Sequence, residues 1–249
     1  MKLLKSRLYR ESGAMDLSEN HLEFNEIEHW YYKEKFRHIK QSILKLAPGF
    51  QTLCDVGAGS APFSRQLSKL FPERRFVAVD INYSKDILGQ IEDGVEFDNK
   101  VCAADIYLLN DVLEHLENPK DLLRQIQEKA PGGSLFVITV PASMKLWSGH
   151  DIYLNHFRRY TKDLLLDDLT ELHLLNLRTC YLFNFLFVPV FLTRRFSKKN
   201  IATQLSKSGF LQSLVAHLLI NLDHITRNRL PFGVSILAVF QLGVGERSI

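Results

Sequence analysis

Apolar residues occur along the chain in two alternating patterns. Continuous apolar runs with the length of buried parallel strands occupy residues 51–56, 75–80, 104–110 and 133–140. Helical spacing separates these runs, first at 62–70 and later from Asn118-Pro119 to Pro131-Gly132. Strands that alternate with helices predict an α/β fold with a doubly wound, mostly parallel sheet.

The remaining patterned segments complete the predicted fold. A helical pattern from Asn25 to Leu46 stops at Pro48-Gly49 and predicts a cap helix on the sheet. Further expected elements are a helix at 84–91, a short third strand at 95–102, a capped helix at 161–169, a sixth strand within 172–183 and a last strand at 233–242. We therefore expect seven strands in one compact domain, because 249 residues can bury a substantial core.

Three regions make up this domain. Residues 1–48 form an N-terminal arm and the cap helix, with an irregular stretch over the first 24 residues. Residues 49–180 form the α/β core, which contains the predicted strands that precede the last one. Residues 181–249 add an apolar and helical segment and the final strand.

The segment 181–192 is almost wholly apolar and is followed by a basic cluster, Arg194, Arg195, Lys198 and Lys199. It is well short of the ~20 residues that a membrane-spanning helix needs, and Pro189 interrupts it. One interpretation is a core helix followed by solvated charges. The other is contact of residues 181–199 with a membrane surface, because an apolar segment beside basic residues suits a bilayer interface. A second amphipathic stretch, 211–225, is a candidate partner or lid helix.

Composition limits the class of protein further. The net charge of +3 is too small to indicate a nucleic-acid partner. Three scattered cysteines fit a reducing cytoplasm, and the basic start at residues 1–7 has no apolar stretch of a signal peptide. Nine histidines invite a metal interpretation, but none has the local spacing of a structural zinc site, so we predict no metal.

A glycine-rich turn follows the first predicted strand. Asp55 ends the strand, and Gly57, Ala58 and Gly59 form a turn in which a ligand can approach the backbone without a Cβ in the way. The next helix offers unpaired N–H groups at its start. The second strand ends in Asp80, about 20 residues further on, where an acid suits ribose hydroxyl groups.

These features resemble the cofactor site of class I S-adenosylmethionine (SAM)-dependent methyltransferases. Two further segments, Asp111-Val-Leu-Glu-His and Trp147-x-x-His-Asp followed by His156-x-Arg-Arg-Tyr, resemble one bacterial group of that family. The resemblance implies a Rossmann-like fold with a final antiparallel strand, and SAM as the methyl donor, with S-adenosylhomocysteine (SAH) as product. The cofactor-binding residues that it implies are Asp55, Gly57, Ala58, Gly59, Asp80, Ile81, Asn110, Asp111 and Lys35. Lys35 stands where the group has an arginine that faces the cofactor carboxylate.

The resemblance also implies an acceptor site in the loop after the fifth strand. A histidine can remove the acceptor's proton near neutral pH, and the candidates are His115, His150 and His156. His150 beside Asp151 has the composition of an oriented base, although a structural role stays open for each histidine. Candidate substrate-binding residues are Trp147, Asp151, Arg158, Arg159 and Tyr160; the arginines suit an anionic acceptor or a structural ion pair, and Tyr160 suits packing.

The sequence therefore predicts a methyltransferase that acts on a small-molecule or lipid-linked acceptor, in the cytoplasm or associated with a membrane. Two alternatives remain. One is a non-catalytic SAM-binding protein that regulates a partner. The other, a nicotinamide-dependent oxidoreductase on the same sheet topology, is disfavoured because Pro62 replaces the third glycine of that fingerprint. The acceptor, the atom methylated and the oligomeric state stay open.

Overall fold

The structure is a computed structural model that describes residues 30–196, 218–223, 225–226 and 229–243. The predicted irregular arm at 1–24, the first residues of the cap helix and the start of the 211–225 stretch lie outside the described residues.

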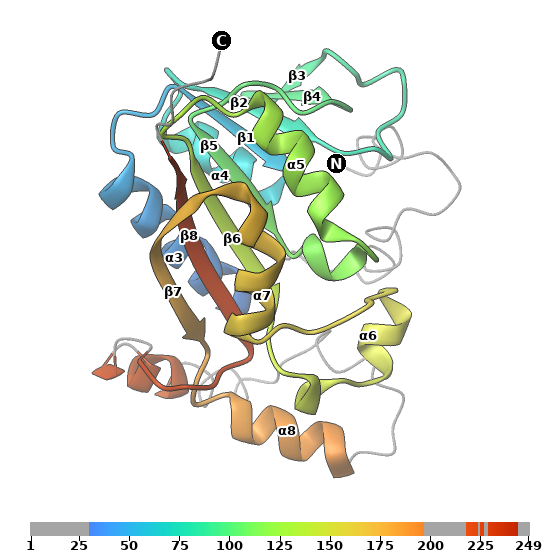
Figure 1. The fold of residues 1–249 in the computed structure, drawn as a ribbon, viewed down its shortest axis with the longest axis vertical. Coiled ribbons are helices and arrows are strands. Elements are labelled where there is room, and N and C mark those ends of the chain that lie inside the picture. The colour runs from blue at the N-terminus through green and yellow to red at the C-terminus, as the bar shows by residue number, and fades with distance from the viewer. Residues whose placement is uncertain (1–29, 197–217, 224, 227–228, 244–249) are drawn as a thin grey trace.

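One sheet runs through the molecule in the strand order β3-β4-β2-β1-β5-β6-β8-β7 (Figure 1). Its strands are β1 Thr52–Val56, β2 Arg75–Val79, β3 Ile91–Glu92, β4 Val95–Asp98, β5 Ile106–Asn110, β6 Leu135–Pro141, β7 Leu174–Leu182 and β8 Ser235–Leu242. The inner pairs β4–β2, β2–β1, β1–β5 and β5–β6 are parallel, whereas β8 is antiparallel to both β6 and β7. The predicted doubly wound, mostly parallel sheet with a final antiparallel strand is confirmed.

Helices cover both faces of this sheet. The longer ones are α3 Trp30–Leu46, α4 Pro62–Leu70, α5 Pro119–Lys129, α7 Lys162–Leu169 and α8 Phe187–Phe196; α6 Gly149–Tyr153 and the 3₁₀ turns η2 Leu113–His115, η3 Met144–Leu146 and η4 Thr170–Leu172 are short. Helices α3 and α4 pack on one face with Leu53 and Leu108, and α5 and α7 pack on the other with Cys54 and Leu109. Consecutive strand residues thus enter opposite cores, which explains why the strands are apolar throughout.

The outer edge of the sheet differs from the prediction in three ways. Residues 85–89 form turns instead of a helix, and Gly89 has φ +77°. The strand expected at 95–102 is shorter, since β4 ends at Asp98, and β3 is an additional strand that was not predicted. Strands β3 and β4 form a hairpin through Asp93-Gly94, where both residues have positive φ. Asp-Gly is a strong hairpin signal. The sequence therefore contained the signal for this additional short strand.

The capped helix expected at 161–169 is confirmed, since Thr161 Oγ1 accepts a hydrogen bond from Leu164 N at 3.2 Å. The apolar segment 181–192 is not a core helix. It ends strand β7 and then forms α8 at the periphery, where Val188 and Leu192 are exposed. Among the described residues, no helix is long and apolar enough to cross a membrane.

Candidate active site

The predicted glycine turn lies at the carboxyl end of β1 and bonds to the end of β2. Gly57 N and Ala58 N both donate to Val79 O, at 2.7 and 3.1 Å. Gly57 has φ +69°, and a Cβ there would lie 2.8 Å from a methyl carbon of Val112. The glycine is therefore required by the backbone conformation and by the close approach of Val112.

Asp80 fixes the outer side of the same turn. Its Oδ2 accepts Gly59 N at 3.2 Å, and its Oδ1 accepts Asn82 N at 2.9 Å. Tyr83 donates its hydroxyl hydrogen to Gly59 O at 2.7 Å, so two side chains hold the backbone N–H and C=O of Gly59. The neighbouring Ile81 is 85% exposed, a large apolar side chain beside a carboxylate at a strand end. Residues Gly57–Ser60 with Asp80–Asn82 are called the glycine edge below.

Asp55 lies beneath the glycine edge and is buried. Its carboxylate accepts a hydrogen bond from Ser64 Oγ in the first turn of α4. The pKa of Asp55 is raised to about 7, mainly by burial; the Ser64 hydrogen bond opposes this shift and the negative charge of Asp80 adds to it. Of the two roles that the sequence suggested, this position favours orienting the loop over contacting a ligand.

Lys35 and Asp111, both predicted to contact the cofactor, form an ion pair with each other. Lys35 is fully buried on α3, and its ammonium also lies 4.8 Å from the centre of the Tyr31 ring. Burial lowers the pKa of Lys35, but Asp111 and Tyr31 outweigh this effect and hold the pKa above its ordinary value. Next to Asp111, Asn110 Oδ1 accepts Thr139 Oγ1 at 2.6 Å. Asn110 and Asp111 lie where β5 ends, and β5 is the neighbour of β1, which leads into the glycine edge.

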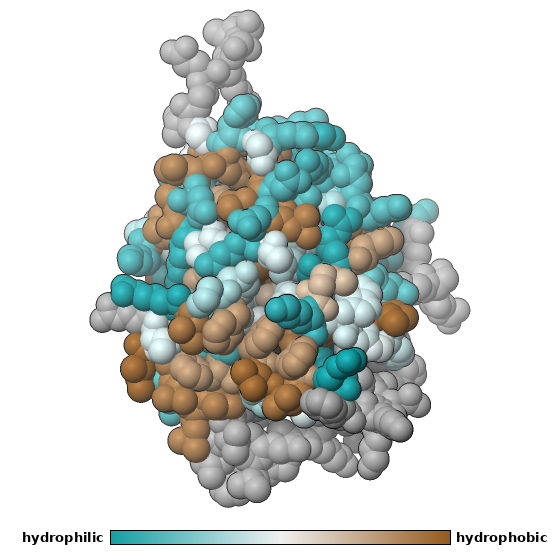
Figure 2. All heavy atoms as spheres, turned by 60° about the horizontal axis from the view of Figure 1, so that its bottom comes forward, coloured by the Kyte–Doolittle hydropathy of each residue, from teal (hydrophilic) through white to brown (hydrophobic). Residues whose placement is uncertain are grey.

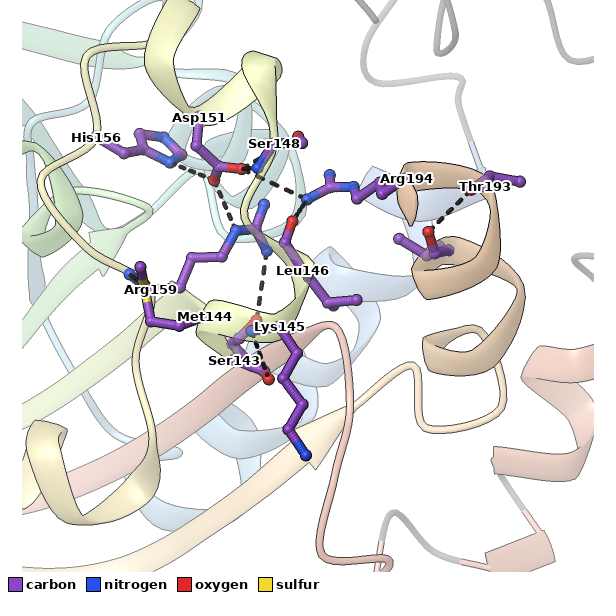
Figure 3. A network of polar contacts seen from close by, with 12 residues as sticks. Ser143, Met144, Lys145, Leu146, Ser148, Asp151, His156, Arg159, Thr193 and Arg194 are labelled. Carbon is purple, nitrogen blue, oxygen red and sulfur yellow. Dashed lines mark hydrogen bonds and ion pairs between the residues drawn. The ribbon is translucent and has the colours of Figure 1, made fainter. Parts of the chain in front are cut away.

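A buried carboxylate organises the loop after β6 (Figure 3). Asp151 Oδ1 accepts His156 Nδ1 at 3.0 Å and Arg159 Nε at 2.6 Å. Asp151 Oδ2 accepts Ser148 N at 2.9 Å and lies 3.5 Å from Arg194 Nη1. Burial raises the pKa of Asp151, but the His156 and Arg159 contacts outweigh it and hold the pKa well below its usual range. These five residues are called the carboxylate cluster below.

The other predicted substrate-binding residues mostly contact the protein itself. Arg159 also donates to Ala142 O at 3.4 Å, and Arg158 donates to the backbone carbonyls of Leu116 and Glu117. Tyr160 is buried and donates to Asp168 Oδ2 at 3.0 Å, which agrees with the packing role. Trp147 follows η3 and is half-buried.

The three candidate histidines divide into a pair and a single residue. The rings of His115 and His156 meet edge-on with centroids 4.6 Å apart. Asp151 hydrogen-bonds to His156 and not to its sequence neighbour His150, so the predicted His150–Asp151 dyad is not formed. Burial, together with the positive charge of Arg194, lowers the pKa of His150 to about 4.

Two residues of this region were not singled out from the sequence. Arg194 lies in a basic cluster that one interpretation treated as solvated, yet it donates to Leu146 O and reaches Asp151 from α8 (Figure 3). Glu114 belongs to the Asp111-Val-Leu-Glu-His motif and is buried beside His115. An acid inside a matched motif was the available signal for Glu114, whereas no local signal distinguishes Arg194.

Comparisons with known proteins agree with this arrangement. The family model described as "Methyltransferase domain" matches residues 27–210. No curated protein matches the sequence significantly. Among solved structures, the plantazolicin methyltransferase BpumL with a triazolic desmethylPZN analog and SAH has a TM-score of 0.54 and 14% identity over 92% of this chain and 90% of its own. A putative sarcosine dimethylglycine methyltransferase from Galdieria sulphuraria has a TM-score of 0.54 and 12% identity over 86% and 87%.

A third similar structure is the N-methyltransferase NodS from Bradyrhizobium japonicum WM9 in complex with SAH, with a TM-score of 0.50 and 11% identity over 92% and 97% of the two chains. At these identities the structures establish the fold, and the family model covers most of the chain. The chain therefore belongs to the methyltransferase-domain family and is a SAM-dependent methyltransferase with the class I fold.

Proposed function

We propose that this methyltransferase binds SAM along the glycine edge and Asp111, and transfers the methyl group to a small-molecule acceptor beside His115 and His156. The observation that carries the proposal is the clustering of the predicted cofactor residues at the carboxyl ends of the adjacent strands β1, β2 and β5. Ligands of open α/β sheets bind at this edge.

The side chains present at this edge fit the chemical groups of SAM. Asp80 is a carboxylate held at the strand end, suited to ribose hydroxyl groups, and the exposed Ile81 offers an apolar surface to an adenine ring. The Lys35–Asp111 pair offers opposite charges for the ammonium and carboxylate of the methionine part. When bound, SAM supplies an activated methyl group on its sulfonium, so the protein mainly has to position the acceptor and exclude water.

The acceptor side follows from what lies next to Asp111. Turn η2 places Glu114 and His115 there, and the carboxylate cluster brings His156 from the following loop. An imidazole in this position can take the proton that a hydroxyl or amine acceptor releases. The names of the similar structures include a plantazolicin analog and sarcosine dimethylglycine, which supports a small-molecule acceptor here as well.

A lipid-linked acceptor is the second candidate, because apolar side chains gather on the face where α8 lies (Figure 2). The large apolar residues exposed on α8, on the helical residues 218–223 and 225–226, and after them are Val188, Leu192, Leu218, Leu222, Ile225 and Phe232. Arg195 adds an exposed positive charge at the end of α8. An apolar face with basic residues suits an anionic bilayer.

Transfer of a radiolabelled methyl group tests the acceptor class. Purified protein and methyl-labelled SAM are incubated separately with the low-molecular-mass fraction, the lipid extract and the macromolecular fraction of a bacterial lysate. We expect label in the low-molecular-mass fraction, and much less of it with the Asp80→Ala variant when SAM is limiting. Label confined to lipid would favour the second candidate, and sedimentation with anionic vesicles would support it. Tight SAM binding without transfer to any fraction would contradict both and favour the non-catalytic alternative.

A further inference from the structure

Three side chains next to the proposed acceptor position form a group that methyl transfer does not by itself require. Glu114, His115 and His156 each offer one ligand atom, and these atoms lie within 4.8 Å of one another. It is the one group of three or more such residues found among the described residues. Glu114 and His115 come from η2, and His156 follows α6, so the fold assembles the group from two separate segments.

Two of these side chains have buried polar atoms without a hydrogen-bond partner. Glu114 is 1% exposed, and its Oε2 has no partner among the described residues. Nδ1 of His115 is likewise buried and unpartnered there. Leaving a carboxylate oxygen and a ring nitrogen buried and unsatisfied costs free energy, and the cost is greater for a charged group than for a neutral one. A ligand that accepts electron pairs from both atoms would remove that cost.

The third side chain is held in the way that metal-bound histidines are held. Asp151 accepts a hydrogen bond from Nδ1 of His156, so the other ring nitrogen, Nε2, keeps its lone pair. A carboxylate behind a histidine fixes the tautomer and orients the ring for a metal ion. Asp151 itself is anchored by Arg159 and Ser148, which makes this arrangement rigid.

We propose that Glu114, His115 and His156 bind one divalent transition-metal ion. Two imidazole nitrogens and one carboxylate are a ligand set for Zn²⁺, Mn²⁺ or Fe²⁺, whereas Mg²⁺ and Ca²⁺ prefer oxygen ligands throughout. Ligands about 2.1 Å from a tetrahedral ion are about 3.4 Å apart. The three ligand atoms already lie within 4.8 Å of one another. Side-chain rotations that shorten these separations by up to about 1.4 Å would bring the atoms to coordination distance without backbone movement.

Three protein ligands leave at least one coordination position open, as in metal sites that act on a substrate. The role of that position rests on the proposed function. An acceptor hydroxyl bound there would lose its proton more readily, because the cation stabilises the resulting oxyanion. With the cation bound, both imidazoles are ligands and no longer take the proton, which passes to solvent instead; the deprotonated oxygen then forms the bond to the methyl carbon as the bond from sulfur to that carbon breaks.

A metal-free explanation of the same geometry exists and gives a different result. A protonated Glu114 hydrogen-bonded to His115 through a small rotation would satisfy both atoms without a cation. In that case Glu114→Gln would conserve the contact and change no metal affinity. A measurement of metal affinity alone therefore distinguishes the two explanations, and it does not require a known acceptor.

The experiment uses the full chain without an affinity tag, treated with a chelator and then titrated with Co²⁺, whose visible absorption reports ligand type and geometry. We expect one Co²⁺ per chain, displaced by Zn²⁺ but not by Mg²⁺ or Ca²⁺. Glu114→Gln and His156→Gln should each weaken the affinity at least tenfold. The matched control His173→Asn replaces an exposed histidine outside the group, at φ +49° where asparagine is tolerated, and should bind as the wild type does.

Thermal unfolding and SAH titration are measured for each variant, so that misfolding is recognised. If Glu114→Gln does not fold, His156→Gln, at a less buried position, takes its place as the test variant. Absence of stoichiometric Co²⁺ binding to the wild type, or equal affinities in all variants, would overturn the metal site. Full methyl transfer by chelator-treated protein would overturn only the role of the cation. Metal binding without SAH binding would instead count against the proposed function.

Discussion

The glycine edge follows the carboxyl ends of β1 and β2, and the carboxylate cluster follows the carboxyl end of β6. The two regions are stabilised by different contacts. In the glycine edge, backbone N–H groups bond to Val79 O and Asp80, and the residues involved are close in sequence or on neighbouring strands. In the carboxylate cluster, one buried anion holds His156 and Arg159 from the loop that follows it and Arg194 from α8. The glycine edge depends on backbone conformation, whereas the carboxylate cluster depends on charge balance. Different kinds of substitution should therefore destabilise the two regions.

The largest effect is expected where charge balance is lost. Asp151→Ala removes the acceptor of Arg159, which is only 4% exposed, and leaves that charge buried without its partner. We expect the free energy of unfolding in urea to fall by about 3–5 kcal/mol. Glu171→Gln, which breaks the exposed ion pair with Arg124, is the control and should cost under about 1 kcal/mol. Equal losses in both variants would show that the buried ion pairs of the carboxylate cluster contribute no more than an exposed ion pair.

Backbone conformation in the glycine edge is tested by Gly57→Ala. The change places a Cβ against Val112 at φ +69°, so we expect a loss of about 2–4 kcal/mol in the free energy of unfolding. Adding Val112→Ala should recover the steric part only. Gly49→Ala is the matched control, because nothing lies within 4 Å of its Cβ position. A Gly57→Ala variant as stable as Gly49→Ala would show that the turn tolerates a side chain.

Cofactor affinity should depend on the carboxylate of the glycine edge. Asp80→Ala removes an acceptor from the strand end and releases the Gly59 N–H. Since a hydrogen bond to a charged group contributes about 1.5–3 kcal/mol, calorimetry should show SAH binding weakened about 10- to 100-fold. Asp121→Ala, on the exposed surface of α5, should bind SAH as the wild type does. Unchanged affinity in Asp80→Ala would remove Asp80 from the cofactor site.

The smallest expected effect concerns pH. Burial raises the pKa of Asp55 to about 7, above its value in the unfolded chain, so the folded state binds the proton more tightly. Its contribution to stability is therefore present at pH 5 and is lost as the pH rises through 7. We expect the free energy of unfolding of the wild type to fall by about 1–2 kcal/mol more between pH 5 and 7.5 than that of Asp55→Asn. Identical pH slopes in urea unfolding would contradict the raised pKa.

The sequence predicted the glycine edge well because its determinants are local. A strand, two glycines and an acid at fixed spacing predicted the fold of residues 52–80, and the structure adds the hydrogen bond from Gly59 N to Asp80. The same holds for the buried strands, whose apolar residues on both faces require helices on both sides. The one short strand that was missed, β3, is stabilised by a hairpin turn at Asp93-Gly94 that hydrophobic periodicity does not report.

The carboxylate cluster was predicted only in composition. Its histidines, arginines and Asp151 were recognised as chemically important, but their partners depend on which side chains are buried together. Asp151 bonds to His156, five residues further on, and not to the adjacent His150. Arg194 reaches the cluster only because α8 packs beside η3. Such contacts follow from tertiary packing, which spacing in one sequence does not encode.

The position of β8 has a consequence for how the chain is made. Strand β8 pairs with β6 on one side and β7 on the other, and β8 is the only strand that β7 contacts among the described residues. A ribosome completes β1, β2 and β5 early, so the glycine edge can form while synthesis continues. Until residues 235–242 emerge, β6 presents an unpaired edge and β7 has no neighbour. The nascent chain thus carries an exposed strand edge, prone to pairing with other chains, until β8 has emerged.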